Sequence, residues 1–264
     1  MLVLMKGAGD LASGIACRLL RSGFQVIMTE IPRPTTVRCS VAFSSAVYQK
    51  EVCIEGLFGV LAADPQEALE IAASGKAAVL VDPACSCLSV LKPDVLVDAI
   101  IAKRNTGTKR TDAAIVIGVG PGFSAPEDCH CVVETKRGHD LGRVYYEGHA
   151  IPNTGIPGDI GGYSVERLVR SSADGVFEPV ATIGDIVKAG QVVAMVGTSP
   201  VRAQIDGVLR GLLPEGTPVT AGMKAGDVDP RCEVSHCYSV SDKARAIGGG
   251  VLEGILHELS RMQK

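Results

Sequence analysis

The 264-residue chain contains no tryptophan and only five phenylalanines and five tyrosines. Aromatic side chains are the usual platforms on which unpaired bases stack, so their scarcity argues against binding of single-stranded nucleic acid. A basic surplus is also missing, because the formal net charge at pH 7 is −3. The chain is therefore not expected to bind nucleic acid, and any anion site must be a local group of arginines and lysines.

Long apolar runs are missing as well. The apolar run at residues 1–5 is too short for the core of a signal peptide, and no run approaches the roughly 20 residues of a membrane span. We therefore expect no membrane contact and a cytoplasmic location, where the nine cysteines are reduced thiols. With 46% apolar and 21% charged residues, the composition is that of a globular protein.

The N-terminal half alternates apolar strands with helices. Residues 2–6 and 24–29 are predicted as strands, and residues 11–19 between them have helical apolar spacing, ended by Gly23. A second helix is predicted to start at Pro65 and to run to about residue 74. Further buried strands are predicted at residues 77–81, 95–97 and 113–119. This alternation indicates an α/β protein with a Rossmann-like parallel sheet, a nucleotide-binding domain over residues 1–125.

The rest of the chain has a different texture. Short apolar strands separated by glycine turns predict a mostly β domain over residues 126–240. Ser241 is then expected to cap a C-terminal helix at residues 241–264. Glycines 248–250 fall inside this helix at a cost of about 1 kcal/mol each. We expect either a break in the helix or a close backbone approach there.

Residues 174–229 resemble the lipoyl/biotinyl hammerhead module, a flattened β-sandwich. The resemblance is carried by residues 183–191 and 201–208, and by Gly216 and Gly222. Carrier members of that group place a lysine at a hairpin tip, which here would be residues 197–200 and contains no lysine. The module is therefore expected to be architectural, or to act as a lid, and not to carry an acyl group.

A glycine-rich turn follows the first predicted strand. Gly7, Gly9 and Ala12 match the dinucleotide fingerprint, in which small residues let the backbone approach a pyrophosphate at a helix N-terminus. Glu30 ends the next strand, at the distance expected for an acid that binds a ribose. The pattern predicts a nucleotide-type ligand; the alternative is a tight turn that packs helix on sheet without a ligand.

Charged residues around this turn include one that would oppose an anionic ligand and two that would favour it. The Asp10 carboxylate would repel a phosphate if it faced the ligand, but it could instead cap the helix. Arg33 and Arg38 are candidates to bind the anion or a 2′-phosphate, and the alternative for both is solvated loop charge.

Two further regions combine cations with glycines or hydrogen-bonding side chains at predicted strand ends. Such groups suit phosphates or carboxylates, although a run of charges is commonly a solvated face. Ligands of open α/β sheets collect at these ends. The candidates are Lys103, Arg104, Asn105, Gly120, Gly122 and Arg137.

The cysteine and histidine groups lack a convincing metal pattern. Cys129, His130 and Cys131 lie near His139, but on a strand both cysteines would point one way and His130 the other. We therefore predict no metal site. Cys85, Cys129 and Cys131 are candidates for a reactive thiol, which requires a lowered pKa.

Several blocks together carry a resemblance to a known family. They are residues 7–14, 28–30, 102–108, 120–123, 133–139, 153–158, 226–231 and 241–250. These blocks are similar to the YqeB family, an accessory group associated with selenium-dependent molybdenum hydroxylases. The resemblance covers almost the whole chain and implies a role in maturing such a hydroxylase. It supplies no reaction, so the catalytic residues stay unknown.

Three functions fit the sequence. The first is a maturation factor that binds a nucleotide-like ligand, either a molybdopterin-type dinucleotide or NAD(P), and acts on a molybdenum hydroxylase. The second is an NAD(P)-dependent oxidoreductase with His130, His139 or Lys103 as proton donor, although no Tyr-x-x-x-Lys pair is present. The third is a non-catalytic scaffold that docks a hydroxylase. The ligand's identity, the occurrence of catalysis and the oligomeric state stay open.

Overall fold

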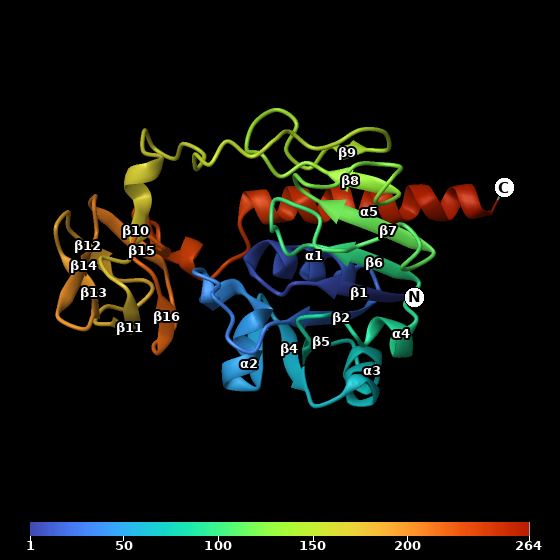
Figure 1. Cartoon of the computed structure of the whole chain (residues 1–264), viewed down its shortest axis with the longest axis horizontal. Coiled ribbons are helices and arrows are strands. Elements are labelled where there is room, and N and C mark those ends of the chain that lie inside the picture. Colours follow the sequence, from blue (N-terminus) through green and yellow to red (C-terminus); the bar gives the residue numbers. More distant parts are fainter. Residues whose placement is uncertain (264) are drawn as a thin grey trace. The chain divides into compact units, whose positions relative to one another are not determined.

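A computed structural model describes residues 1–263 (Figure 1). The contacts divide the chain into two compact units. The first comprises residues 1–34 and 42–154 together with the C-terminal segment from residue 240, and the second comprises residues 35–41 and 155–239. These bounds differ from the boundaries expected from the sequence, because residues 126–154 and the C-terminal helix join the first unit.

The first unit is built on a nine-stranded sheet with the order β3-β4-β5-β2-β1-β6-β7-β8-β9. Its strands are β1 (Leu2–Lys6), β2 (Gln25–Glu30), β3 (Glu51–Ile54), β4 (Leu57–Ala62), β5 (Ala77–Val81), β6 (Val95–Asp98), β7 (Ile115–Val119), β8 (Cys131–Val133) and β9 (Val144–Tyr145). Neighbouring strands from β4 to β8 are parallel, whereas β3 with β4 and β8 with β9 are antiparallel. The sheet is therefore mixed.

Helices cover both faces of this sheet. Ile15 of α1 (Asp10–Arg21) and Val251 of α5 (Asp242–Met262) belong to the core on one face. Ala68 of α3 (Pro65–Ala73) and Leu91 of α4 (Leu88–Leu91) belong to the core on the other face. Shorter helices in this unit are α2 (Ala46–Gln49) and the 3₁₀ helix η2 (Phe43–Ser45). The sequence places α3 correctly, since Pro65 is its first residue and the Asp64 carboxylate accepts the Glu67 N–H at 2.9 Å.

The predicted fold class is wrong for the first unit. A Rossmann-like parallel domain requires helical crossovers between its parallel strands. Within residues 1–263, the connections from β6 to β7 and from β7 to β8 contain no helix, and antiparallel strands close both edges of the sheet. The helix that covers β7 and β8 is α5, which comes from the far end of the chain. The first unit is therefore a mixed α/β structure with a large sheet.

The second unit consists of two four-stranded antiparallel sheets, with the orders β10-β17-β15-β12 and β14-β13-β11-β16. Its strands are β10 (Leu168–Arg170), β11 (Gly175–Pro179), β12 (Ile186–Val187), β13 (Val192–Val196), β14 (Ser199–Arg202), β15 (Gly207–Leu212), β16 (Thr217–Val219) and β17 (Lys224–Asp229). Short 3₁₀ helices complete it: η1 (Cys39–Val41), η3 (Val165–Arg167) and η4 (Val234–Cys237). The predicted hammerhead module at residues 174–229 is corrected to this pair of sheets, which also recruits β10 from outside that range.

The glycines of α5 mark a close approach and no break, since the helix is continuous from Asp242 to Met262. A Cβ atom added to Gly248 would lie 3.1 Å from the Gly14 carbonyl oxygen on α1, and one added to Gly250 would overlap the Gly142 carbonyl. Ser241 caps the helix as predicted, because its Oγ accepts the Ala244 N–H at 3.1 Å. No helix within residues 1–263 is both long and apolar enough to cross a membrane.

Candidate functional site at the carboxyl edge of the sheet

A row of polar side chains crosses the carboxyl edge of the nine-stranded sheet. Lys6, the last residue of β1, is in register with Thr29 on β2 and with Asp98 on β6. Side chains in register on parallel strands point to the same face. The preceding residues of that face, Leu4 and Ile27, are in the core that α3 and α4 cover, so the polar row lies on this face. We call Thr29, Lys6 and Asp98 the polar row.

Thr108, in the loop after β6, ties Lys6 and Asp98 of the polar row together. Lys6 Nζ lies 3.2 Å from Asp98 Oδ2 and donates to Thr108 Oγ1 at 2.7 Å. Thr108 Oγ1 in turn donates to Asp98 Oδ2 at 2.6 Å. The Lys6 and Asp98 side chains are only 12% and 2% exposed. Removing either partner would leave a buried charge uncompensated, which is strongly destabilising.

The glycine turn next to this row has the backbone shape that the sequence predicts. Gly7 has a φ of 93°, and a Cβ atom added to it would lie 3.0 Å from the Ala99 carbonyl oxygen. Gly9 is the N-cap of α1. Its backbone is extended, and it makes no side-chain capping hydrogen bond. Asp10 is the first helical residue and not the cap. The N-cap residue therefore offers no side chain to the amides of the first turn, an arrangement that suits an anion.

Glu30 lies against this turn. Its Oε2 accepts the Ala8 N–H at 3.0 Å, and its Oε1 accepts the Ile31 N–H at 2.8 Å. Burial raises the pKa of the carboxyl, and the two amide hydrogen bonds only partly oppose that rise. Each oxygen keeps one lone pair for a further donor, such as a hydroxyl group.

Ser13 fixes the turn from the helix side. Its Oγ donates to the Ala8 carbonyl oxygen at 3.1 Å and accepts the Phe43 N–H at 2.7 Å. The Ser44 N–H also donates to the Ala8 carbonyl oxygen, at 2.8 Å. Ala12, the third small residue of the fingerprint, is buried. The turn is therefore held in one conformation before any ligand is bound.

The predicted arginines do not gather at the turn. Arg38 belongs to the second unit, where its Nη2 donates to the carbonyl oxygens of His236 and Ser239 at 2.9 and 3.1 Å. Arg137 forms a two-point ion pair with Asp242 at 2.6 and 2.9 Å. Arg33 is exposed in the loop after β2. The first two thus have structural partners that the sequence pattern did not predict.

The loop after β6 arranges the remaining predicted side chains. Asn105 Oδ1 accepts the N–H groups of Gly107 and Thr108 at 2.9 and 2.8 Å, and its Nδ2 donates to the Thr108 carbonyl at 2.8 Å. Asn105 therefore positions the threonine that contacts the polar row. Lys103 and Arg104 are exposed, and Lys103 has a φ of 63°.

The second glycine cluster, after β7, is packed by protein atoms. A Cβ atom added to Gly120 would lie 2.9 Å from Thr135 Oγ1, and one added to Gly122 would overlap the Arg104 backbone. These glycines therefore permit close packing of loops. Protein atoms, and not a ligand, occupy the space beside both glycines.

The side chains of Cys129 and Cys131 lie on opposite faces of the sheet, unlike the arrangement predicted from the sequence. Cys129 precedes β8 and belongs to the core on the α3 face, whereas Cys131 on β8 belongs to the core on the α5 face. The prediction that they point the same way is wrong, because the strand starts only at residue 131. No group of three or more metal-ligating side chains that could hold an ion occurs within residues 1–263.

Cys85 and Cys87 lie beside the polar row. Both are buried in the core on the α3 face, and Cys85 has a φ of 54°. Hydrogen bonding with Cys87, followed by the Lys6 charge and Thr29, lowers the pKa of Cys85 despite its burial, whereas hydrogen bonding with Cys85 and burial raise the pKa of Cys87. Sequence reasoning singled out Cys85 but missed Cys87 and the polar row.

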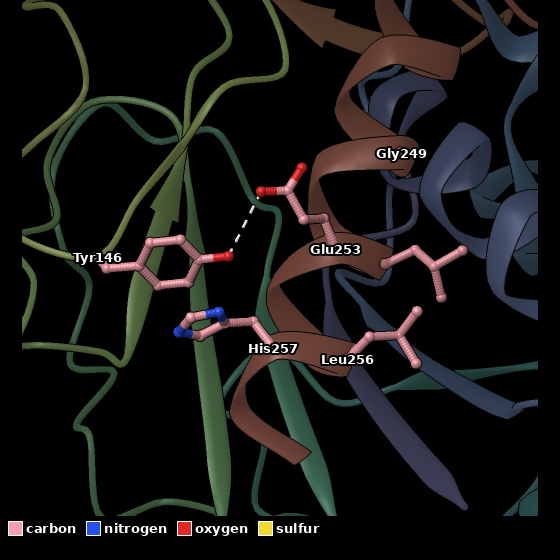
Figure 2. Close-up of a pocket in the computed structure, with 6 residues that line it drawn as sticks. Tyr146, Gly249, Glu253, Leu256 and His257 are labelled. Atoms are coloured by element: carbon pink, nitrogen blue, oxygen red, sulfur yellow. Dashed lines mark hydrogen bonds between the residues drawn. The ribbon is translucent and has the colours of Figure 1, made fainter. Parts of the chain in front are cut away.

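A separate open pocket lies against α5 (Figure 2). The rings of Tyr146 and His257 stack with centroids 4.0 Å apart, and the Tyr146 hydroxyl contacts Glu253 Oε1 at 3.4 Å. Burial, and next the Glu253 charge, raise the pKa of Tyr146 to about 12. None of the residues predicted to bind a ligand lines this pocket.

The candidate proton donors also lie apart from the turn. His130 precedes β8, and its Nδ1 accepts the Val116 N–H at 3.0 Å near the amino end of β7. Burial, assisted by Arg110, lowers the pKa of His130. His139 is exposed in the loop after β8. The structure therefore gives no support to a histidine acting at the glycine turn.

Over 255 residues the chain is 50% identical to a protein of Escherichia coli (strain K12) named "Uncharacterized protein YqeB". The match covers 97% of this chain and 47% of that protein, so the chain spans about half the length of this relative. No family model matches the chain.

Similar solved structures are distant. An aspartoacylase family protein of Mesorhizobium loti is 11% identical, with 86% of this chain and 84% of that chain covered and a TM-score of 0.30. A succinylglutamate desuccinylase of Silicibacter sp. is 14% identical, with the same shares covered and a TM-score of 0.26.

Proposed function

We propose an accessory function that depends on binding a nucleotide-like ligand, for a chain that is 50% identical to the YqeB protein over the segment the two share. One observation carries the proposal: α1 begins at the carboxyl edge of the sheet with no side-chain cap, beside the half-buried Glu30 carboxylate. In open α/β sheets, ligands bind at the carboxyl edge between two neighbouring strands whose connections run to opposite sides. Strands β1 and β6 are such neighbours, because β1 is followed by β2 on one side and β6 is followed by β7 on the other.

The chemistry of the turn suits a phosphate joined to a ribose. The uncapped amides at the start of α1 would bind the phosphate oxygens, assisted by the helix dipole. Glu30 would accept the ribose hydroxyls with its remaining lone pairs, which would offset part of the cost of its burial. The fit is to a nucleotide such as NAD(P) or to a molybdopterin-type dinucleotide.

The biological setting comes from the family resemblance alone. It supports a role in maturing a selenium-dependent molybdenum hydroxylase, with the bound nucleotide as cofactor or cargo. The hydroxylase is the partner that we propose. No contact among the described residues favours the oxidoreductase or the scaffold hypothesis.

Calorimetry with NAD⁺, NADPH, CTP and molybdopterin cytosine dinucleotide tests the proposal. We expect at least one of them to bind, and Asp10→Asn to strengthen its binding up to about fivefold, because a negative charge at the helix start is removed. Asp64→Asn is the matched control, since Asp64 is the N-cap of α3 in the same unit. Absence of binding by all four at millimolar concentration, or an equal effect of both substitutions, would contradict the proposal.

A further inference from the structure

One side of α5 forms the floor of the open pocket in Figure 2. The floor residues lie at helical spacing, which places them on one side of the helix: Gly249, Leu252, Glu253, Leu256 and His257. Tyr146, which follows β9, faces this side with its ring stacked on the His257 imidazole. The pocket measures about 640 Å³ and is open to solvent, so it has the size and the access of a small-molecule site.

Gly249 differs from the other glycines of α5. Gly248, Gly250 and Gly254 each face protein atoms that an added Cβ atom would crowd, whereas one added to Gly249 would meet nothing within 4 Å. A glycine inside a helix lowers its stability. Gly249 therefore weakens α5 without improving the packing of residues 1–263, and the space that its missing side chain leaves is part of the pocket.

The lining combines apolar surface with one negative charge. Leu256 is 53% exposed, and Leu252 is only partly packed against the core. Glu253 has no ion pair among residues 1–263, because the nearby Arg261 pairs with Glu258 at 3.4 Å instead. An apolar surface beside an uncompensated carboxylate is complementary to a cation that carries an apolar group.

Two oxygen atoms converge at the edge of this surface. The Tyr146 hydroxyl points toward Glu253 and lies 3.4 Å from its Oε1, which is long for a hydrogen bond between two oxygens. An ammonium group has three donors and can bind both oxygens at once. Since burial, and next the Glu253 charge, raise the pKa of Tyr146 to about 12, the phenol stays neutral and Glu253 supplies the charge.

We propose that this pocket binds a small organic ammonium ion. The ammonium group donates to the Glu253 carboxylate and to the Tyr146 hydroxyl oxygen, and the apolar group of the ligand lies on Leu252 and Leu256 in the space beside Gly249. The site does not rest on the nucleotide proposal, because none of the residues of the glycine turn lines it.

The test titrates the full chain, with isotope-labelled leucine methyl groups, with phenethylamine at pH 7, where an alkyl ammonium keeps its proton. The NMR signals of Leu252 and Leu256 are assigned from their loss in Leu252→Met and Leu256→Met. Phenethyl alcohol has nearly the same shape without the charge. We expect both signals to shift in a saturable way, and the amine to bind at least tenfold more tightly than the alcohol.

Two variants assign the contacts. Glu253→Gln should weaken binding of the amine at least tenfold and leave the alcohol unchanged, whereas the matched control Glu70→Gln, at an exposed position on α3, should change neither. Gly249→Leu should weaken both ligands at least tenfold by filling the pocket, although leucine favours the helix more than glycine does. Thermal unfolding confirms that each variant is folded.

Three results would overturn the proposal. They are leucine signals that do not move at millimolar amine, equal affinities for the amine and the alcohol, and signals that shift with protein concentration alone, which would mean that a second copy of the chain covers this side of α5. The comparison of the two ligands on the wild-type chain decides the matter if a variant fails to fold. Nucleotide is absent throughout, so failure here leaves the nucleotide proposal intact.

Discussion

Cys85 and Cys87 share their spacing with Cys129 and Cys131, and both pairs lie in the first unit. The first pair occupies one turn at the carboxyl edge, where both cysteines belong to the core on the α3 face. The second pair straddles the sheet at the start of β8, with one cysteine in each of the two cores. The same spacing therefore places two thiols in one core in the first case and in two different cores in the second.

The electrostatics of the two pairs differ accordingly. Burial raises the pKa of Cys129 from 9.0 to about 12, and burial also raises the pKa of Cys131. Cys85 is buried as well, but hydrogen bonds from Cys87 and Thr29 and the charge of Lys6 lower its pKa. The neighbours of Cys85 thus reverse the direction in which burial alone would shift the pKa of its thiol.

The largest expected difference is in alkylation of the folded chain. At pH 8 we expect iodoacetamide to modify Cys85 about 1,000-fold faster than Cys129, since three pKa units separate an ordinary thiol from Cys129. The rates are measured by mass spectrometry of peptides from timed samples. In denaturant the two rates should become equal, and a difference that persists there would mean that the folded environment is not its cause.

The second prediction concerns the free energy of unfolding, on which a smaller effect is expected. It tests whether Cys131, a member of the second pair, is a packing residue of the core. A Cβ atom added to Gly254 on α5 would lie 2.7 Å from Cys131 Sγ. Gly254→Ala should therefore lower the free energy of unfolding by about 1–2 kcal/mol, because overpacking outweighs the gain in helix propensity. Urea unfolding measures the change.

Two further substitutions test that explanation. Gly249→Ala is the control, because a Cβ atom there meets nothing within 4 Å, and it should stabilise the chain by up to about 1 kcal/mol. Cys131→Ala should suppress most of the penalty of Gly254→Ala when the two are combined. Additive effects in the double variant would show that Cys131 is not what Gly254→Ala overpacks.

Local features of the fold were predictable from the sequence. The start of α3 and the cap of α5 depend on residues within four positions, Asp64 with Glu67 and Ser241 with Ala244. The glycine turn was placed correctly for the same reason. The mixed sheet was not predictable, because apolar strands look alike whether their neighbours are parallel or antiparallel, and a helix from the far end of the chain covers one face.

The candidate site was harder to predict because its contacts are distant in sequence. Lys6 meets Thr108 across 102 positions, and neither residue has a local pattern that marks it. Arg137 was expected to bind an anion, but its partner Asp242 is 105 positions away. Sequence reasoning could count these charges but could not pair them.

The smallest expected effect isolates the contribution of Lys6 to the first pair. A thiol whose pKa is lowered gains thiolate below pH 9.0, so its alkylation rate at pH 7 exceeds that of an ordinary thiol and levels off at a lower pH. Lys6→Gln should raise the pKa of Cys85 and slow its alkylation at pH 7 by up to about tenfold, with little change at pH 10.

Lys76→Gln is the matched control, because Lys76 is exposed and pairs with Glu51 away from the carboxyl edge. Asp82, the negative group facing Cys85, is retained in both variants. Since Lys6→Gln also leaves Asp98 without its cation, the pH profile is recorded below the unfolding temperature of each variant. A profile unchanged by Lys6→Gln would mean that Cys87 and Thr29 alone account for the reactivity of Cys85, and a rate that falls equally at pH 7 and pH 10 would point to altered access instead of altered ionisation.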